Sequence, residues 1–191
     1  MGMTETAIMA QQNEIKAIIR QQRQEKRKQA EQFDIYSILN GEVSERQAFR
    51  KMFSSTSSNP KTAIKQYMQY ISKLFEAYRN GAVQKESFRH MVYAANQVKN
   101  NAIRLNEEYN LKLLCGNKQN ADLCFKKPYY ANYNDLSHMD NVELKRNFID
   151  NMGELIAGTA DAFDAKNTPQ IVANCLAIDN FVELTSHFQN L

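Results

Sequence analysis

Residues that break regular backbone structure are scarce in this chain, which has six glycines and three prolines among 191 residues. Sheets depend on tight turns, and tight turns draw on glycine and proline, so an all-β fold is the first class that this composition excludes. Tryptophan is absent, but ten phenylalanines, nine tyrosines and eight methionines supply large side chains for a core. A chain of this length can bury such a core without disulfides or metals. We therefore expect an all-α fold, built as a helical bundle.

Long apolar runs are absent as well. No run approaches the ~20 apolar residues that a membrane-spanning helix requires, and the N-terminus lacks the apolar segment of a secretory signal. The sequence thus predicts no membrane insertion and a cytoplasmic location. The alternative is an exported or periplasmic protein whose signal has been trimmed, because Cys115 and Cys124 close the polar stretch "CGNKQNADLC" and could form a disulfide. Cys175, inside the apolar run "IVANCLAI", is expected to be a buried thiol.

Glycine and proline are missing from residues 5–39, which predicts one long helix that stops at Asn40-Gly41. Apolar side chains recur at helical spacing near its start, at Ile8, Ile15, Ile18 and Ile19, and again near its end, at Phe33, Ile35, Tyr36, Ile38 and Leu39. Residues 20–32 offer only Ala30 as an apolar side chain, so about 20 Å of helix has no face to bury. We expect residues 1–40 to form a long helix that is free to project from a bundle domain at 41–191.

The bundle domain is expected to contain about four long helices and one short helix. Two helix starts are marked by capping boxes, Ser44 with Gln47 and Asp140 with Glu143. Two more are marked by a proline in the first turn, Pro60 and Pro169, the latter after Thr168. The expected helices span residues 45–53, 60–79, 84–114 and 141–165, followed by a last one that opens at Thr168-Pro169. Val92 and Tyr109 are among the residues expected on the buried side of the helix at 84–114. Residues 117–140 form an unusually long loop, which predicts either a functional element or a hidden short helix.

Positive charge is concentrated in the first helix. Four cations fall at steps of four, three and four residues and so share one helix face: Lys16, Arg20, Arg23 and Arg27. A helix of this kind can contact phosphates, which makes nucleic-acid binding one interpretation. An acidic protein surface is another, and a solvated face with no partner is the plainest. Membrane-surface binding fits poorly, because the opposite face lacks large apolar side chains.

Two Glu-x-x-x-His pairs, Glu86 with His90 and Glu183 with His187, place a carboxylate and an imidazole on one helix face. Two such helices facing each other could supply four metal ligands. Ferritin-like di-iron helices use a spacing of three instead, and a pair at a spacing of four is more often a contact that stabilises the helix. No metal is therefore expected, and these four residues remain weak candidates.

The loop stretch "FKKPYYANYNDLSHMD" combines aromatic rings with lysines. Tyr129, Tyr130 and Tyr133 resemble a recognition surface in composition, since tyrosine buries a large area and keeps a polar tip. The alternative is that these rings cover one end of the bundle.

No constellation of residues points to catalysis. Only three histidines are available as general bases, and the chain lacks a phosphate-binding glycine loop, zinc-ligand spacing and a dinucleotide fingerprint. We predict a non-enzymatic helical interaction protein, such as an adaptor, a chaperone-like component or a secreted accessory factor. It needs no cofactor, and no small-molecule substrate is evident. Its anchors would be the four isoleucines, for a helix-on-helix contact that includes self-association, and the three tyrosines of the loop. Nucleic-acid binding through the basic face is the first alternative, and a metal-binding bundle is the second.

Overall fold

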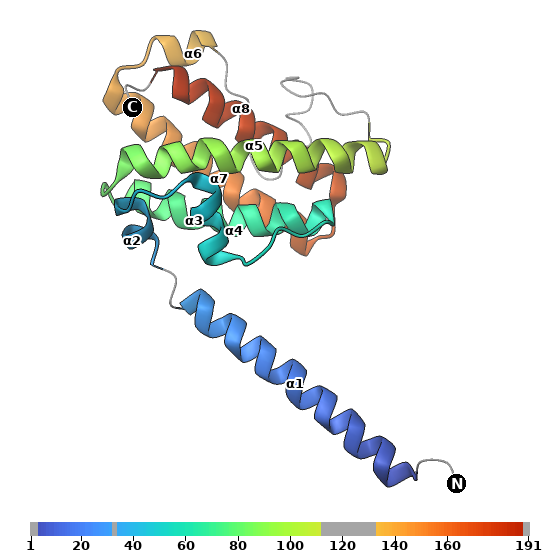
Figure 1. Ribbon diagram of the computed structural model, residues 1–191. Helices are drawn as coiled ribbons and strands as arrows, with labels where there is room; N and C mark the ends of the chain where they lie inside the picture. The colour runs from blue at the N-terminus through green and yellow to red at the C-terminus, as the bar shows by residue number, and fades with distance from the viewer. Residues whose placement is uncertain (1–3, 32–33, 112–132, 189–191) are drawn as a thin grey trace. The chain divides into compact units, whose positions relative to one another are not determined.

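The computed structural model describes residues 4–31, 34–111 and 133–188 and divides the chain into two compact units, Met1–Asp34 and Ile35–Leu191. The described residues of the first unit form one helix, α1 (Glu5–Glu31) (Figure 1). The second unit contains α2 (Ile35–Asn40), α3 (Glu45–Met52), α4 (Pro60–Arg79), α5 (Gln84–Glu108), α6 (Tyr133–Ser137), α7 (Asn141–Asp164) and α8 (Thr168–Phe188). The described residues hold helices and no strand, which confirms the all-α class.

Four long helices form the body of the second unit. α4 packs along α5, α5 along α8 and α8 along α7, while α4 and α7 touch over a shorter stretch. The short helices α2 and α3 lie against α4 and α5, and α6 lies against α8. Every residue from 171 to 179 is buried, so α8 is surrounded by its neighbours. A helix that is apolar on all sides has to be covered in this way, and the predicted burial of Cys175 is confirmed.

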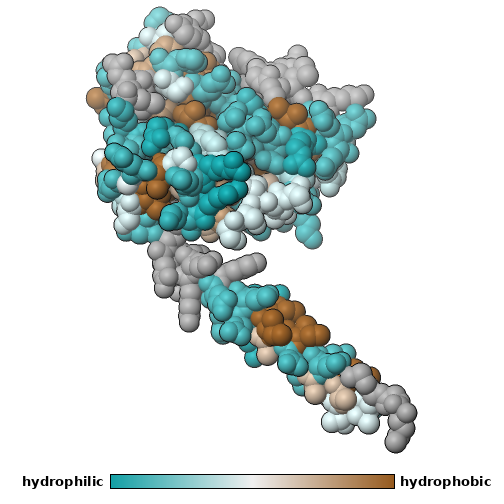
Figure 2. All heavy atoms as spheres, viewed as in Figure 1, coloured by the Kyte–Doolittle hydropathy of each residue, from teal (hydrophilic) through white to brown (hydrophobic). Residues whose placement is uncertain are grey.

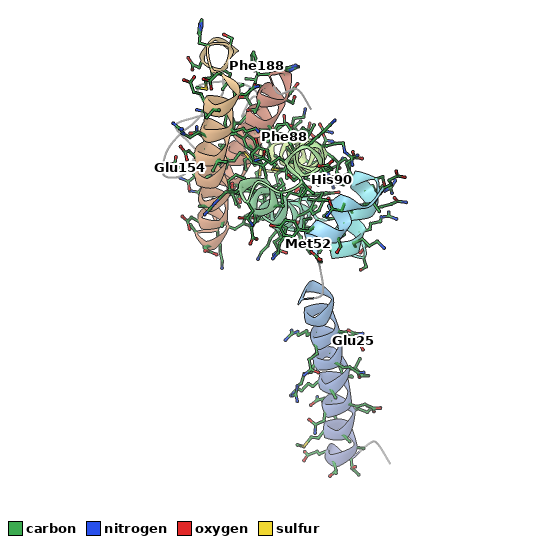
Figure 3. The ribbon with its side chains drawn as sticks, turned by 90° about the vertical axis from the view of Figure 1, so that its left-hand side faces the viewer. Glu25, Met52, Phe88, His90, Glu154 and Phe188 are labelled. Carbon is green, nitrogen blue, oxygen red and sulfur yellow. The ribbon has the colours of Figure 1, made fainter. Side chains whose placement is uncertain are left out.

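The core is held by aromatic rings that come from all four long helices. The ring of Phe148 on α7 lies 5.2 Å from that of Tyr78 on α4, 5.2 Å from that of Phe88 on α5 and 5.5 Å from that of Phe181 on α8, between centroids. These side chains are fully buried or nearly so, and Figure 3 shows Phe88 where the helices meet. Aromatic pairs at this separation add to the free energy of burial, so this cluster joins the four helices.

Both predicted capping boxes are present as hydrogen bonds. Ser44 Oγ accepts from the backbone N–H of Gln47 at 3.2 Å, and the side chain of Gln47 accepts from the N–H of Ser44 at 3.1 Å. The same reciprocal pair joins Asp140 and Glu143. Asn59 accepts from the first N–H groups of α4, where Pro60 occupies the first turn. Each cap satisfies N–H groups that the helix itself leaves unpaired.

The prediction of one helix over residues 5–39 is wrong. α1 ends at Glu31, and a separate helix, α2, begins at Ile35. Asp34 directly precedes α2, and aspartate is a preferred residue at a helix start. Ile35 and Leu39 are buried, and α2 contacts α4 and α5. Ile35, Tyr36, Ile38 and Leu39 of the second apolar stripe therefore belong to the unit Ile35–Leu191. The expectation for Phe33 lies outside the described residues.

The end of α5 also differs from the prediction. The helix stops at Glu108 and not near residue 114, because Asn110 takes a left-handed conformation (φ +50°). The N–H of Asn110 then donates to the carbonyl of Glu107, and the N–H of Leu111 to that of Asn106, which is a Schellman motif. Val92 and Tyr109, expected to be buried, are 37% and 55% exposed.

Two further expectations concern the remaining segments. A short helix is present in the predicted loop, because α6 spans Tyr133–Ser137 and buries Leu136. The expectations for Cys115, Cys124, Tyr129 and Tyr130 lie outside the described residues.

α8 begins one residue before its proline, and Asn167, not Thr168, accepts the capping bond, from the N–H of Gln170 at 3.2 Å. Across the described helices, none combines the length and the apolar character needed to cross a membrane.

Candidate functional site

The isoleucine stripe of α1 is a surface feature. We use this name for Ile8, Ile15, Ile18 and Ile19, which are between 43% and 57% exposed. Thr4 caps the helix, with Oγ1 accepting from the N–H of Ala7 at 3.3 Å. Residues at this spacing lie on one face of an α-helix, and Figure 2 shows apolar side chains gathered on α1. Large aliphatic side chains at this exposure are the kind of surface that a partner covers.

The predicted basic face of α1 is exposed where the structure describes it. Lys16, Arg20 and Arg23 are all exposed, and none of them forms a salt bridge with another described residue. The side chain of Arg27 lies outside the description, as does that of Tyr133 in α6. On a helical projection this face borders the isoleucine stripe, so apolar and cationic side chains are available side by side.

His90 occupies a closed polar cluster in the bundle. Its Nδ1 lies 3.0 Å from the hydroxyl oxygen of Tyr70, and its Nε2 lies 3.3 Å from Nη2 of Arg89, whose Nη1 pairs with Glu45 at 2.8 Å. A guanidinium can only donate, so Nε2 accepts and Nδ1 carries the proton that is donated to Tyr70. Burial and then Arg89 lower the pKa of His90, and burial raises the pKa of Tyr70. Both rings stay neutral, and both imidazole nitrogens are in use.

The other Glu and His pair is a surface pair. Glu183 and His187 are exposed on α8, and Glu86 on α5 is half-buried. The structure describes both pairs but does not assemble them, because no three histidine, cysteine, aspartate or glutamate side chains among residues 4–31, 34–111 and 133–188 are grouped to hold a metal ion. His90 could bind a metal only by giving up one of its hydrogen bonds.

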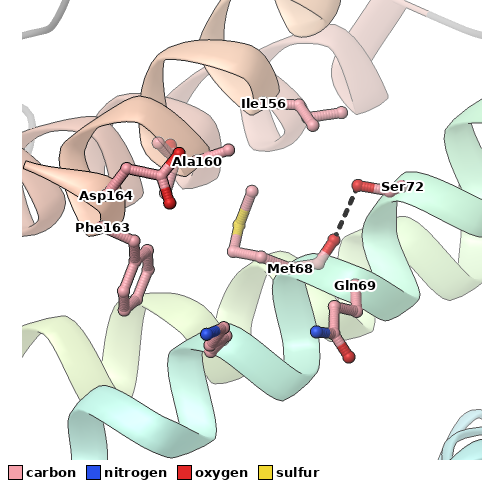
Figure 4. A pocket seen from close by; sticks show the side chains of 9 residues that line it. Met68, Gln69, Ser72, Ile156, Ala160, Phe163 and Asp164 are labelled. Carbon is pink, nitrogen blue, oxygen red and sulfur yellow. Dashed lines mark hydrogen bonds between the residues drawn. The ribbon is translucent and has the colours of Figure 1, made fainter.

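A hollow between α4 and α7 is a feature that sequence reasoning missed (Figure 4). Its volume is about 240 Å³. Met68, Ile156 and Phe163 supply apolar lining, and Lys65 and Asp164 add charges of opposite sign. Ligand pockets usually measure roughly 300–1,000 Å³, so this hollow is small for a ligand of ordinary size.

A buried carboxylate between α5 and α8 was also missed. Asp179 is 9% exposed and lies 3.6 Å from Nζ of Lys99. Burial raises its pKa to about 6, although Lys99 acts in the opposite direction. The signal available in the sequence was its position in the most apolar helix, where a polar side chain is surrounded by neighbours.

Fold and surface together define a class: an all-α protein whose described residues form one helix, α1, with an exposed isoleucine stripe, and a second unit of packed helices. No family model matches the sequence, and comparisons with curated proteins and with solved structures give no match either. Function therefore has to be inferred from these residues.

Proposed function

We propose that this chain is a non-enzymatic interaction protein that binds another protein through α1. The observation that carries the proposal is the exposure of the isoleucine stripe, at 43–57% per side chain. An isoleucine that is half-exposed on its own helix can release about 1 kcal/mol when a partner covers it. Four of them therefore favour a contact by about 4 kcal/mol, before the cost of association is subtracted.

The partner's chemistry follows from the length of the stripe and the charge beside it. A stable coiled coil needs apolar positions over about three to four heptads, whereas the stripe covers only residues 8–19. A second copy of α1 would thus bury too little to hold a pair together. Lys16, Arg20 and Arg23 border the stripe and are exposed. A groove with an apolar floor and a carboxylate-lined edge satisfies both surfaces, and amphipathic helices commonly bind to proteins in this way.

The test compares two double variants of α1. Ile15→Ala with Ile18→Ala shortens the stripe, and Asn13→Ala with Gln24→Ala makes matched truncations on the opposite face, where both residues are exposed. A photo-crosslinker placed at residue 19 identifies the partner in native extract, and the purified partner is then titrated against each chain. We expect at least tenfold weaker binding for the isoleucine variant and unchanged binding for the control, with equal thermal midpoints for all chains.

Two results would contradict the proposal. One is a partner that binds the isoleucine variant as tightly as the parent chain. The other is a dimer in sedimentation experiments that disappears in the isoleucine variant, which would assign the stripe to a second copy of the chain.

Nucleic-acid binding is the second candidate, supported by the exposed Lys16, Arg20 and Arg23 without a salt-bridge partner among the described residues. It predicts that the affinity for duplex DNA falls with salt, with a log–log slope near −0.9 per phosphate neutralised. Arg20→Gln with Arg23→Gln would reduce that slope by about two phosphates. Absence of binding to DNA and RNA at low salt would remove this candidate.

A further inference from the structure

A second hollow, larger than the one between α4 and α7, lies where α3 meets α4 and α5. Its volume is about 480 Å³, within the range of roughly 300–1,000 Å³ that is usual for small-molecule sites. Phe49 and Tyr67 line it, and their rings stack with centroids 4.2 Å apart and planes 17° apart. Both side chains are buried, at 1% and 4% exposed, so this part of the hollow is a fixed aromatic wall that offers a ligand little accessible surface.

Two arginines lie one turn apart on α3 and line the same hollow. Arg46 and Arg50 are exposed, and neither forms a salt bridge with another residue in the described part of the chain. No carboxylate among residues 4–31, 34–111 and 133–188 lines the hollow. Glu45, the acidic residue next to Arg46, is engaged with Arg89 at 2.8 Å. The site therefore presents two positive charges that no described lining residue compensates.

The remaining polar lining consists of hydrogen-bond donors that carry no charge. Tyr93 and Gln97 reach the hollow from α5, and Thr56 reaches it from the segment before α4. Burial and the neighbouring Tyr67 raise the pKa of Tyr93, so its hydroxyl keeps its proton at neutral pH. Among the charged neighbours, Arg46 lowers that pKa and Glu45 raises it by a smaller amount, so both lie close enough to act on the hydroxyl.

We propose that this hollow binds a small molecule through a phosphate monoester group. Arg46 and Arg50 would hold the phosphate oxygens, and the hydroxyl of Tyr93 would exchange its hydrogen bond with Tyr67 for one to the phosphate. The Phe49–Tyr67 wall would fix the shape of the hollow beneath the ligand. A phosphate monoester carries close to two negative charges and three terminal oxygens at neutral pH, which suits two guanidinium groups and several neutral donors. A carboxylate has one charge and two oxygens, and would leave part of this set unused.

This inference is independent of the contact proposed for α1, because all of its residues belong to the unit Ile35–Leu191. Exposed arginines are often only solvated. This pair lines a hollow of about 480 Å³ to which no described residue adds a carboxylate, and that combination favours a ligand over solvent.

The experiment is calorimetric titration of the full chain with inorganic phosphate, phenyl phosphate, benzoate and a short phosphotyrosine peptide at constant ionic strength. Three chains are compared with the parent: Arg46→Gln with Arg50→Gln, Tyr93→Phe, and Lys73→Gln with Arg79→Gln. The last is the matched control, because Lys73 and Arg79 are exposed cations on α4 that do not line the hollow. It removes the same net charge, and thermal midpoints verify that each variant is folded.

We expect phenyl phosphate to bind more tightly than benzoate. The arginine variant is expected to lose at least tenfold in affinity, Tyr93→Phe a few-fold, and the control variant less than twofold. Inorganic phosphate should compete with phenyl phosphate, since both present the same group.

Four outcomes would overturn the inference. They are the absence of binding at millimolar phenyl phosphate, equal binding of benzoate, equal losses in the arginine and control variants, and a phosphopeptide that binds more than tenfold tighter than phenyl phosphate. The last would assign the site to a phosphorylated protein segment and not to a small molecule.

Discussion

At the scale of single residues, two buried titratable groups oppose each other in their effect on stability. Asp179 has a pKa raised to about 6 from 3.8, mainly by burial. Its folded form therefore holds a proton that the unfolded form has lost, and stability falls as the pH rises through this range. His90 has a pKa lowered from 6.5 by burial and by Arg89. The folded state resists protonation there, so stability falls as the pH drops below 6.5.

Replacing Asp179 with asparagine should remove one of these dependences. The folded and unfolded pKa values of Asp179 differ by about two units, which corresponds to about 3 kcal/mol. We expect the free energy of unfolding of the parent chain, minus that of Asp179→Asn, to fall by about 2 kcal/mol of this total between pH 4 and pH 7, because the unfolded carboxyl is already partly ionised at pH 4. Urea titrations at several pH values measure it, and other titrating groups cancel in the difference. A difference that stays constant with pH would contradict the raised pKa.

Tyr70 provides a second prediction at this scale. In Tyr70→Phe, the Nδ1–H of His90 loses the hydroxyl oxygen that lies 3.0 Å away. An unpaired buried donor costs about 1–3 kcal/mol, and we expect the free energy of unfolding to fall by that amount at pH 7. Tyr109→Phe is the control, because Tyr109 is 55% exposed and should change stability by less than about 0.5 kcal/mol. Equal effects of the two changes would show that the cluster does not stabilise the fold.

At the scale of helices, the starts were more predictable than the ends. Ser44 and Gln47, or Asp140 and Glu143, form their bonds within four residues, so the sequence alone identifies them. The end of α5 depends on Asn110 taking a positive φ, which asparagine tolerates but does not require. α7 likewise ends next to a residue with a positive φ, Lys166 at +53°, and nothing in the identity of a lysine predicts that conformation. The apolar run around Cys175 predicted a buried stretch of α8, but it could not show that Asp179 is buried as well, since that depends on how α8 packs against Lys99 of α5.

Variants of Asn110 test the Schellman motif directly. Glycine has no Cβ and adopts a positive φ readily, whereas alanine is strained there. We expect Asn110→Ala to lower the free energy of unfolding by about 1 kcal/mol, and Asn110→Gly to change it by only a few tenths. Chemical denaturation compares the three chains. If alanine and glycine proved equally tolerated, α5 would not be ended by the left-handed residue.

At the scale of the whole molecule, the two units are stabilised by different means. The bundle unit has a core of aromatic and aliphatic side chains that are buried on four long helices. In α1, every side chain from residue 8 to residue 25 is exposed, so the backbone hydrogen bonds of this helix are shielded from water only by its own side chains. Isolated helices are marginally stable in water, because nucleation is costly and little apolar surface is removed from solvent. The hollow beside α3 belongs to the stable unit, and the isoleucine stripe belongs to the other.

Hydrogen exchange should separate the two units. Amides of α8 between Ile171 and Asp179 are buried in the core, so their exchange requires global unfolding and should report the full free energy of unfolding. Amides of α1 between Ile8 and Arg23 open by local fraying, and we expect protection there to be lower by several orders of magnitude. The purified partner should then raise protection in α1 while leaving α8 unchanged. A partner that binds the apolar face of the folded helix stabilises the helix against opening. Protection of α1 equal to that of α8 in the free chain would mean that the helix is already covered, and the isoleucine stripe would then not be free to bind a partner.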